Sequence, residues 1–128
     1  KTFFHGHSYN ANPLGCAAAL ASMELLEGQG DKLEAIESWH REGLLRLAVD
    51  ARLGKPRVCG TIAAVDLESA DGGVYLGPTS KTLCERFLER GFLLRPIGNT
   101  IYVLPPYCIE RPQVEAIYDC IAEVAKTI

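Results

Sequence analysis

The most informative segment of the chain is Leu93-Leu94-Arg95-Pro96-Ile97-Gly98-Asn99-Thr100-Ile101-Tyr102-Val103-Leu104-Pro105-Pro106-Tyr107. Two apolar runs, 92–95 and 100–104, flank Gly98-Asn99, a pair typical of a turn, so they predict two short strands joined by a hairpin. Arg95 ends the first run and so lies between two apolar segments. Because an unpaired charge among apolar residues is costly, this arginine indicates a binding site for an anion.

Start and stop signals in the rest of the chain predict four helices and one further strand. Asn12-Pro13 is typical of a helix start, and Gly28 and Gly91 are typical helix ends. The predicted helices cover about 13–27, 31–52, 78–90 and 112–128, and the further strand covers 58–67. The element order α-α-β-α-β-β-α predicts an α+β fold, a small three-stranded antiparallel sheet covered by helices. A right-handed crossover followed by a hairpin would put the third strand, 100–104, in the middle.

Length and composition predict one domain and argue against several classes of partner. The chain has 128 residues, of which 48% are hydrophobic, so we expect a single domain, 1–128, with residues 1–12 as an N-terminal arm. A net charge of -3 without a basic stripe argues against nucleic acid, including an RNA-binding sheet. The absence of a long apolar run argues against a membrane, and five cysteines without a C-x-x-C pair favour a cytoplasmic protein.

The first predicted helix is apolar nearly all round and rich in alanine. Such a helix is normally buried on several sides. We therefore expect it to pack against something outside this chain. The isolated chain should expose an apolar patch, self-associate, or leave residues 1–12 poorly ordered.

Two places in the sequence carry groups suited to bind a ligand. Arg95 precedes a proline, which restricts its backbone, and a fixed guanidinium suits a carboxylate; the alternative is an ordinary surface arginine. Tyr102 lies nearby across the predicted hairpin, where it would orient the ligand or cover the core. Ser8 precedes a helix start, so its hydroxyl and nearby backbone N–H groups suit a phosphate. His5 and His7 lack a third ligand at a recognisable spacing, so no metal is expected.

Two segments together resemble the class III pyridoxal-phosphate aminotransferases. The first is His5-Gly6-His7-Ser8-Tyr9-Asn10-Ala11-Asn12-Pro13-Leu14-Gly15-Cys16-Ala17-Ala18-Ala19, which is similar to the H-G-x-[ST]-[YF]-x-x-N-P-L-x-C-A-A-A stretch of that family. The second runs from Arg95-Pro96 to Pro105-Pro106-Tyr107 and looks like the ending found in the biotin-pathway members. The similarity spans essentially the whole chain.

The resemblance assigns roles to three residues. It implies that Ser8, where the family usually has threonine, reaches the phosphate of pyridoxal 5'-phosphate in the neighbouring subunit. It implies that Arg95 holds the distal carboxylate of 8-amino-7-oxononanoate and that Tyr102 lines the substrate pocket. The implied fold is the C-terminal small domain of a fold-type I aminotransferase.

The resemblance also implies partners that this chain does not contain. The lysine that binds the cofactor is expected in a large domain upstream, and the full-length enzyme is expected to be a homodimer. No catalytic residue is expected in this chain, which alone should be inactive and should not retain the cofactor. The implied reaction converts 8-amino-7-oxononanoate to 7,8-diaminononanoate in biotin biosynthesis, with S-adenosylmethionine or lysine as amino donor. The alternative is a free-standing module that binds a small molecule or a protein without catalysis.

Overall fold

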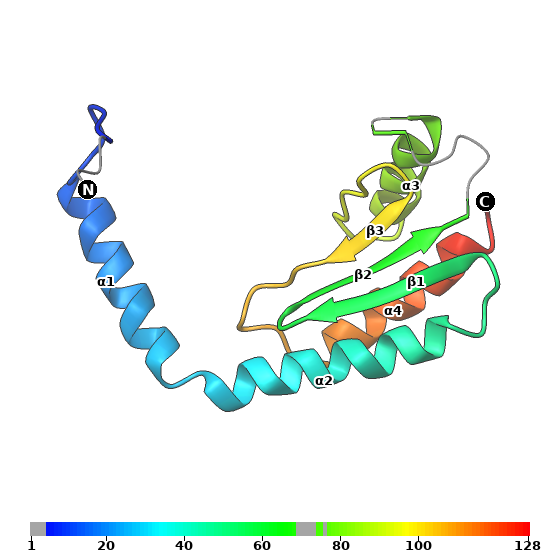
Figure 1. Ribbon diagram of the computed structural model, residues 1–128, viewed down its shortest axis with the longest axis horizontal. Helices are drawn as coiled ribbons and strands as arrows, with labels where there is room; N and C mark the ends of the chain where they lie inside the picture. The colour runs from blue at the N-terminus through cyan, green and yellow to red at the C-terminus, as the bar shows by residue number, and fades with distance from the viewer. Residues whose placement is uncertain (1–4, 69–73, 76) are drawn as a thin grey trace. The chain divides into compact units, whose positions relative to one another are not determined.

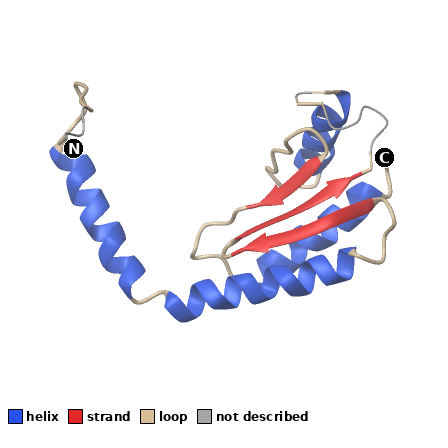
Figure 2. Cartoon of the chain, viewed as in Figure 1, coloured by secondary structure: helices blue, strands red, loops and turns tan. Residues whose placement is uncertain are grey.

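The computed structural model describes residues 5–68, 74–75 and 77–128, and it separates into two compact units. The first unit is Lys1–Asp31 and the second is Lys32–Ile128. Figure 1 shows the chain coloured from its N-terminus to its C-terminus, and Figure 2 shows its helices and strands. Each unit is described by itself.

The first unit is dominated by helix α1, which spans Pro13–Glu27 as predicted. The Asn12 side chain accepts a 3.1 Å hydrogen bond from the backbone N–H of Leu14, and Pro13 occupies the first turn, where its missing N–H is harmless. The helix ends at Gly28. Every residue of α1 is exposed, with Leu14 at 81% and Leu25 at 71%. The helix therefore presents the apolar surface that its composition predicted.

The second unit contains the remaining helices and all the strands. These elements are α2 (Gly30–Leu47, which begins at the unit boundary), β1 (Leu53–Cys59), β2 (Ile62–Leu67), α3 (Pro78–Glu89), β3 (Thr100–Val103) and α4 (Arg111–Ala125). The prediction that α2 continues to about residue 52 was wrong. The chain turns after Leu47 because Asp50 accepts hydrogen bonds from the backbone N–H of Arg52 and from its guanidinium.

The three strands form one antiparallel sheet in the order β1-β2-β3, which confirms the predicted fold class. The predicted strand 58–67 covers β2 and the last two residues of β1, which form a hairpin in the structure; residues 53–57 were not predicted as a strand. Cys59 pairs with Ile62 across Gly60-Thr61. Gly60 has a φ of 54°, the left-handed conformation that the first central residue of a type II′ turn requires.

The expected positions of the later strands need correction. Residues 92–95 form no strand, and β3 lies at the edge of the sheet rather than in its middle. The reason is that the β1–β2 hairpin already supplies two strands, so β3 pairs with the free edge of β2, where Ala64 lies opposite Tyr102.

One face of the sheet packs against the helices of this unit. Leu83 and Phe87 of α3 are fully buried on the inner face of the helix, whereas Leu88 is 63% exposed. The strands and helices share one buried core, formed by Ile36, His40, Leu44 and Leu47 of α2, Ala63, Val65 and Leu67 of β2, Leu83 and Phe87 of α3, Ile101 and Val103 of β3, and Val114, Tyr118, Ile121 and Val124 of α4. The opposite face of the sheet carries the intervening side chains, which are half-buried or exposed.

Candidate functional site

Arg95 differs from the other arginines because it has no carboxylate partner among the residues that the structure describes. Its side chain is exposed, and no hydrogen bond joins it to that part of the chain. Each of the other arginines forms an ion pair, and these pairs are Arg41–Glu37, Arg46–Asp119, Arg52–Asp50, Arg57–Asp66, Arg86–Glu89, Arg90–Glu123 and Arg111 with both Glu42 and Glu115. The N–H donors of the Arg95 guanidinium are therefore open to a ligand.

The segment around Arg95 alternates between inward and outward side chains. Phe92 and Leu94 are half-buried against the core. Leu93, on the other hand, is 79% exposed and Ile97 is 53% exposed. Successive side chains of an extended chain point in opposite directions, so Arg95 points outward between two apolar neighbours.

Pro96 fixes the chain immediately after Arg95. It is buried, and its carbonyl oxygen accepts a 3.1 Å hydrogen bond from the Ser80 hydroxyl of α3. Ser80 itself is only 4% exposed. The backbone that carries Arg95 is thus fastened to a helix that lies earlier in the sequence. No local sequence pattern indicates this contact, because the two residues are sixteen positions apart.

The turn that follows is fastened to the sheet. Gly98 has a φ of 62°, and the backbones of Ile97 and Thr100 exchange hydrogen bonds of 2.9 and 3.0 Å. The Asn99 side chain donates a 2.7 Å hydrogen bond to the carbonyl oxygen of Leu67, whose own N–H donates a 2.9 Å bond to the Asn99 carbonyl. Gly98-Asn99 therefore forms the predicted turn, and β2 holds it in place.

Tyr102 lies on the other arm of this turn. Its neighbours Ile101 and Val103 point into the core, so Tyr102 lies on the opposite face of the sheet, where it is half-buried. Arg95 precedes the Ile97 end of the turn by two residues, and Tyr102 follows the Thr100 end by two residues. No hydrogen bond joins Tyr102 to Arg95. The turn brings the two segments together without a direct contact between the two polar groups.

Asp66 is the centre of a polar cluster next to Tyr102 on the outer face of the sheet. Its carboxylate accepts 2.8 Å hydrogen bonds from Arg57 and from the Thr100 hydroxyl, and Lys55 lies 3.7 Å away. Partial burial pushes the pKa of Asp66 upward, but the hydrogen bonds from Arg57 and Thr100 outweigh it and hold the pKa below its usual value. The charge of Arg57 is therefore already neutralised. No local sequence pattern indicates this cluster, because Arg57, Asp66 and Thr100 come from three different strands.

Ser8, in the first unit, lies at the beginning of a compact turn that leads into α1. The N–H of Asn10 donates a 3.0 Å bond to the His7 carbonyl, and the N–H of Tyr9 donates a 3.1 Å bond to Nδ1 of His7. Ala11 adopts a left-handed conformation, with a φ of 56°, before the Asn12 cap. The Ser8 side chain is exposed. A hydroxyl in the turn that leads into a helix N-terminus suits an anion, because the helix dipole is positive at that end.

No group of three or more His, Cys, Asp and Glu side chains is arranged to hold a metal ion within 5–68, 74–75 and 77–128. In the same residues, no helix is long and apolar enough to cross a membrane.

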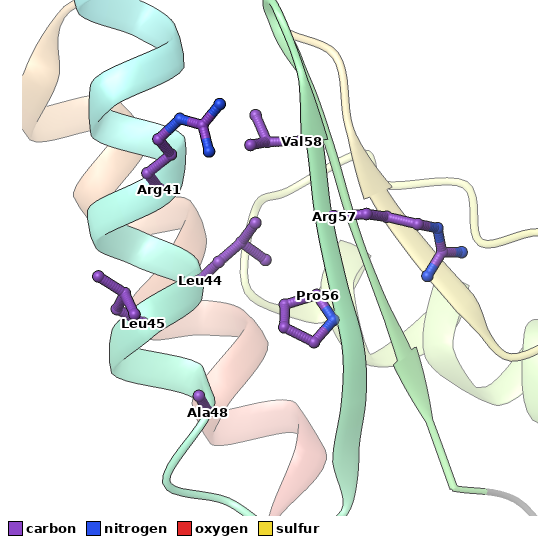
Figure 3. Close-up of a pocket in the computed structure, with 7 residues that line it drawn as sticks. All are labelled: Arg41, Leu44, Leu45, Ala48, Pro56, Arg57 and Val58. Carbon is purple, nitrogen blue, oxygen red and sulfur yellow. The ribbon is translucent and has the colours of Figure 1, made fainter.

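A surface pocket of about 410 Å³ lies between α2 and β1. Figure 3 shows Leu44, Pro56 and Val58 facing one another across it, with Arg57 pointing away. Neither Arg95 nor Tyr102 lines this pocket. The pocket is thus separate from the residues that the sequence singled out.

Comparison with known families decides the family of this chain. The model of the family "Aminotransferase class-III" matches residues 1–125. The chain belongs to this family. The match includes the turn that carries Ser8 as well as the segment that carries Arg95 and Tyr102, so it confirms the resemblance seen in the two motifs.

Two relatives in this aminotransferase family carry the same name and match nearly the whole chain. The chain is 47% identical over 127 residues to the adenosylmethionine-8-amino-7-oxononanoate aminotransferase of Synechococcus elongatus, covering 99% of the chain and 30% of that protein. It is 34% identical to the protein of the same name from Geobacter sulfurreducens, covering 100% of the chain and 30% of that protein. The chain thus spans about 30% of the length of these relatives.

Solved structures of aminotransferases share the fold. The adenosylmethionine-8-amino-7-oxononanoate aminotransferase of Methanocaldococcus jannaschii matches with a TM-score of 0.81 and 28% identity, over 98% of this chain and 30% of that one. The omega transaminase of Pseudomonas jessenii in complex with PMP matches with a TM-score of 0.81 and 23% identity, over 97% of this chain and 29% of that one. The fold is therefore that of a portion of a fold-type I aminotransferase.

Proposed function

We propose that this chain is the C-terminal substrate-binding portion of a pyridoxal-phosphate transaminase that converts 8-amino-7-oxononanoate to 7,8-diaminononanoate in biotin biosynthesis. The observation that carries the proposal is the outward guanidinium of Arg95, which has no carboxylate partner in the described chain although the other arginines are paired. The names of the relatives from S. elongatus and G. sulfurreducens support the choice of substrate.

The surroundings of Arg95 suit a long aliphatic keto acid. The guanidinium would hold the distal carboxylate through two parallel hydrogen bonds. Exposed Leu93 and Ile97 on either side of it offer apolar contacts for methylene groups next to the carboxylate. Tyr102, on the other arm of the turn, would shape the pocket along the substrate chain.

Ser8 and the start of α1 suit the phosphate of the cofactor. The donors are an exposed hydroxyl in the turn that precedes α1 and the N-terminus of that helix, whose positive dipole end matches the charge of a phosphate. In the proposed homodimer, Ser8 would reach the phosphate of the cofactor bound by the partner subunit. When bound, pyridoxal phosphate supplies the chemistry that transfers the amino group.

The proposal requires partners for the exposed surface of α1. An upstream large domain would hold the cofactor lysine, and this domain or the partner subunit would cover the apolar side chains of α1. This chain alone would then neither turn over nor retain the cofactor. The described cysteines are free thiols, which supports a location in the reducing cytoplasm. The relatives' names favour S-adenosylmethionine over lysine as the amino donor.

Substitution of Arg95 in the full-length homodimer tests the function. Arg95→Ala should raise KM for 8-amino-7-oxononanoate by about two orders of magnitude, because a charge-assisted pair is lost. KM for the amino donor should stay unchanged. Arg86→Ala is the matched control, since Arg86 is another exposed arginine but already pairs with Glu89.

Two outcomes of this experiment would count against the proposed function. Unchanged KM for the keto acid in Arg95→Ala rejects the carboxylate clamp. A full-length protein that binds the keto acid without any transamination favours the alternative of a binding module.

A second experiment tests the cofactor contact. Ser8→Ala should weaken retention of pyridoxal phosphate, measured by its absorbance after dialysis, whereas Ser8→Thr should retain it because the hydroxyl remains.

A further inference from the structure

We infer that Ser80 is a positioning residue for the carboxylate-binding arginine. The hydroxyl of Ser80, on the first turn of α3, donates a 3.1 Å hydrogen bond to the carbonyl oxygen of Pro96, the residue that follows Arg95. This inference rests on the proposed function of Arg95. It adds a residue of α3 to the substrate site, although α3 carries no group that would touch the substrate.

The burial of Ser80 is the first argument for this role. The residue is 4% exposed, and a buried hydroxyl is costly unless it makes a hydrogen bond. Serine near the start of a helix usually bonds to the backbone of its own turn. Ser80 instead bonds to a carbonyl sixteen positions along the chain. The hydroxyl therefore serves the segment 92–97 rather than its own helix.

The chemistry of Pro96 is the second argument. Proline has no N–H, so its carbonyl is the one backbone hydrogen-bonding group through which it can be held. The peptide that joins Pro96 to Ile97 lies outside β3. Its N–H, that of Ile97, donates a 2.9 Å hydrogen bond to the Thr100 carbonyl, and its C=O, that of Pro96, accepts from the Ser80 hydroxyl. The Ser80 hydroxyl thus provides a fixed point directly after Arg95, and Leu94, packed on the core, provides one directly before it.

The consequence of this arrangement concerns the direction of the arginine. With Leu94 and Pro96 both held inward, the backbone of Arg95 has little freedom, and its Cα–Cβ bond points away from the core in one direction. Without the Ser80 hydroxyl, the Pro96 carbonyl would lose its hydrogen bond, and this peptide would be held only by packing and by the bond from the Ile97 N–H to Thr100. The carboxylate would then meet an arginine that samples several directions, which weakens binding without removing the charge.

The test uses the full-length homodimer and compares KM with kcat. Ser80→Ala should raise KM for 8-amino-7-oxononanoate about threefold to tenfold, which corresponds to the loss of one hydrogen bond. KM for the amino donor and kcat should stay near the wild-type values. A binding measurement without turnover should agree: by calorimetry, Ser80→Ala should weaken octanoate as a probe but leave octan-1-ol, which lacks the carboxylate, unchanged.

Thr127→Val is a matched control. The Thr127 hydroxyl donates a 2.8 Å hydrogen bond to the Val124 carbonyl, so this variant removes the same type of bond at the chain's far end. It should leave both KM values unchanged. If it raised KM for the keto acid as Ser80→Ala does, the effect would reflect general stability and the inference would be overturned.

The double variant separates this inference from the proposed function. In an Arg95→Ala background, Ser80→Ala should produce no further rise in KM, because there is no guanidinium left to position. An equal rise in both backgrounds would show that Ser80 acts on something else and would overturn the inference alone. If Arg95→Ala itself leaves KM unchanged, the proposed function fails, and the role of Ser80 fails with it.

Discussion

Tyr118 donates a 2.8 Å hydrogen bond from its hydroxyl to Nδ1 of His40, and both side chains are buried. The other ring nitrogen, Nε2, lies 3.1 Å from the carbonyl oxygen of Thr61. A carbonyl only accepts, so Nε2 carries the proton and Nδ1 accepts from Tyr118, which is the neutral form of histidine. The network joins α4, α2 and the turn between β1 and β2 inside the core.

Removal of the Tyr118 hydroxyl should destabilise the chain. Tyr118→Phe leaves Nδ1 of His40 buried without a donor, so the free energy of unfolding in urea should fall by about 1 to 2 kcal/mol. His40→Leu combined with Tyr118→Phe should cost less than the sum of the single variants, because neither partner is then left unsatisfied. Strict additivity would show that the hydrogen bond contributes nothing.

The free energy of unfolding of the chain should decrease as the pH falls from about neutral to 5.5, because His40 is buried. Burial lowers the pKa of His40 from its ordinary 6.5, with the bond to Thr61 acting in the opposite sense. The unfolded chain then binds a proton more readily than the folded chain, so the free energy of unfolding falls as the pH drops below about 6.5. Urea midpoints at pH 7.5, 6.5 and 5.5 measure this. In the His40→Gln variant, the urea midpoint should depend less on pH than in the wild type. An equally steep dependence in both proteins would assign the effect to other groups.

Gly43 of α2 allows the close approach of Tyr118. A Cβ added at Gly43 would collide with the Tyr118 ring. Gly43→Ala should therefore lower the free energy of unfolding by about 1 to 3 kcal/mol, although alanine favours helices. Gly30→Ala, in the same helix but with nothing within 4 Å of the added Cβ, is the matched control and should not destabilise. Equal effects of the two substitutions would contradict this explanation.

Asp50 should contribute to stability only above strongly acidic pH. Hydrogen bonds from the Arg52 side chain and backbone lower the pKa of the Asp50 carboxyl from 3.8 to about 2. The folded chain keeps this carboxylate ionised where the unfolded chain is protonated, so its contribution is present above about pH 4 and is lost as the pH falls toward 2. Thermal unfolding across pH 5 to 2 should show a smaller acid loss for Asp50→Asn than for the wild type. If the melting temperatures of the two proteins fell in parallel with pH, Asp50 would make no such contribution to stability.

Much of the helical structure follows from local chemistry and was predicted. Asn12-Pro13 begins α1 and Gly91, with a φ of 83°, follows the end of α3, because capping and left-handed residues act within one turn of the chain. The family was also recognised, since its motifs are runs of neighbouring residues. The roles of Ser8, Arg95 and Tyr102 remain predictions.

The sheet was harder to predict because its pairing depends on contacts distant in sequence. Residues 58–67 are mostly apolar, and the Gly60-Thr61 turn within them is visible only as a single glycine. Residues 92–95 have the composition of a strand, yet the edge of β2 is taken by β3. The hydrogen bond from Ser80 to Pro96 is likewise a tertiary contact that no local pattern indicates.

The inward and outward alternation of residues 92–97 restricts how this segment can change during evolution. A deletion or insertion of one residue would shift the register, so that the Arg95 charge would face the core and Leu94 would face solvent. Changes of two residues would preserve the alternation but would move the arginine along the surface by roughly 7 Å, at about 3.3 Å per residue. Family members that accept substrates of another length are therefore expected to differ here by substitution or by even-numbered steps.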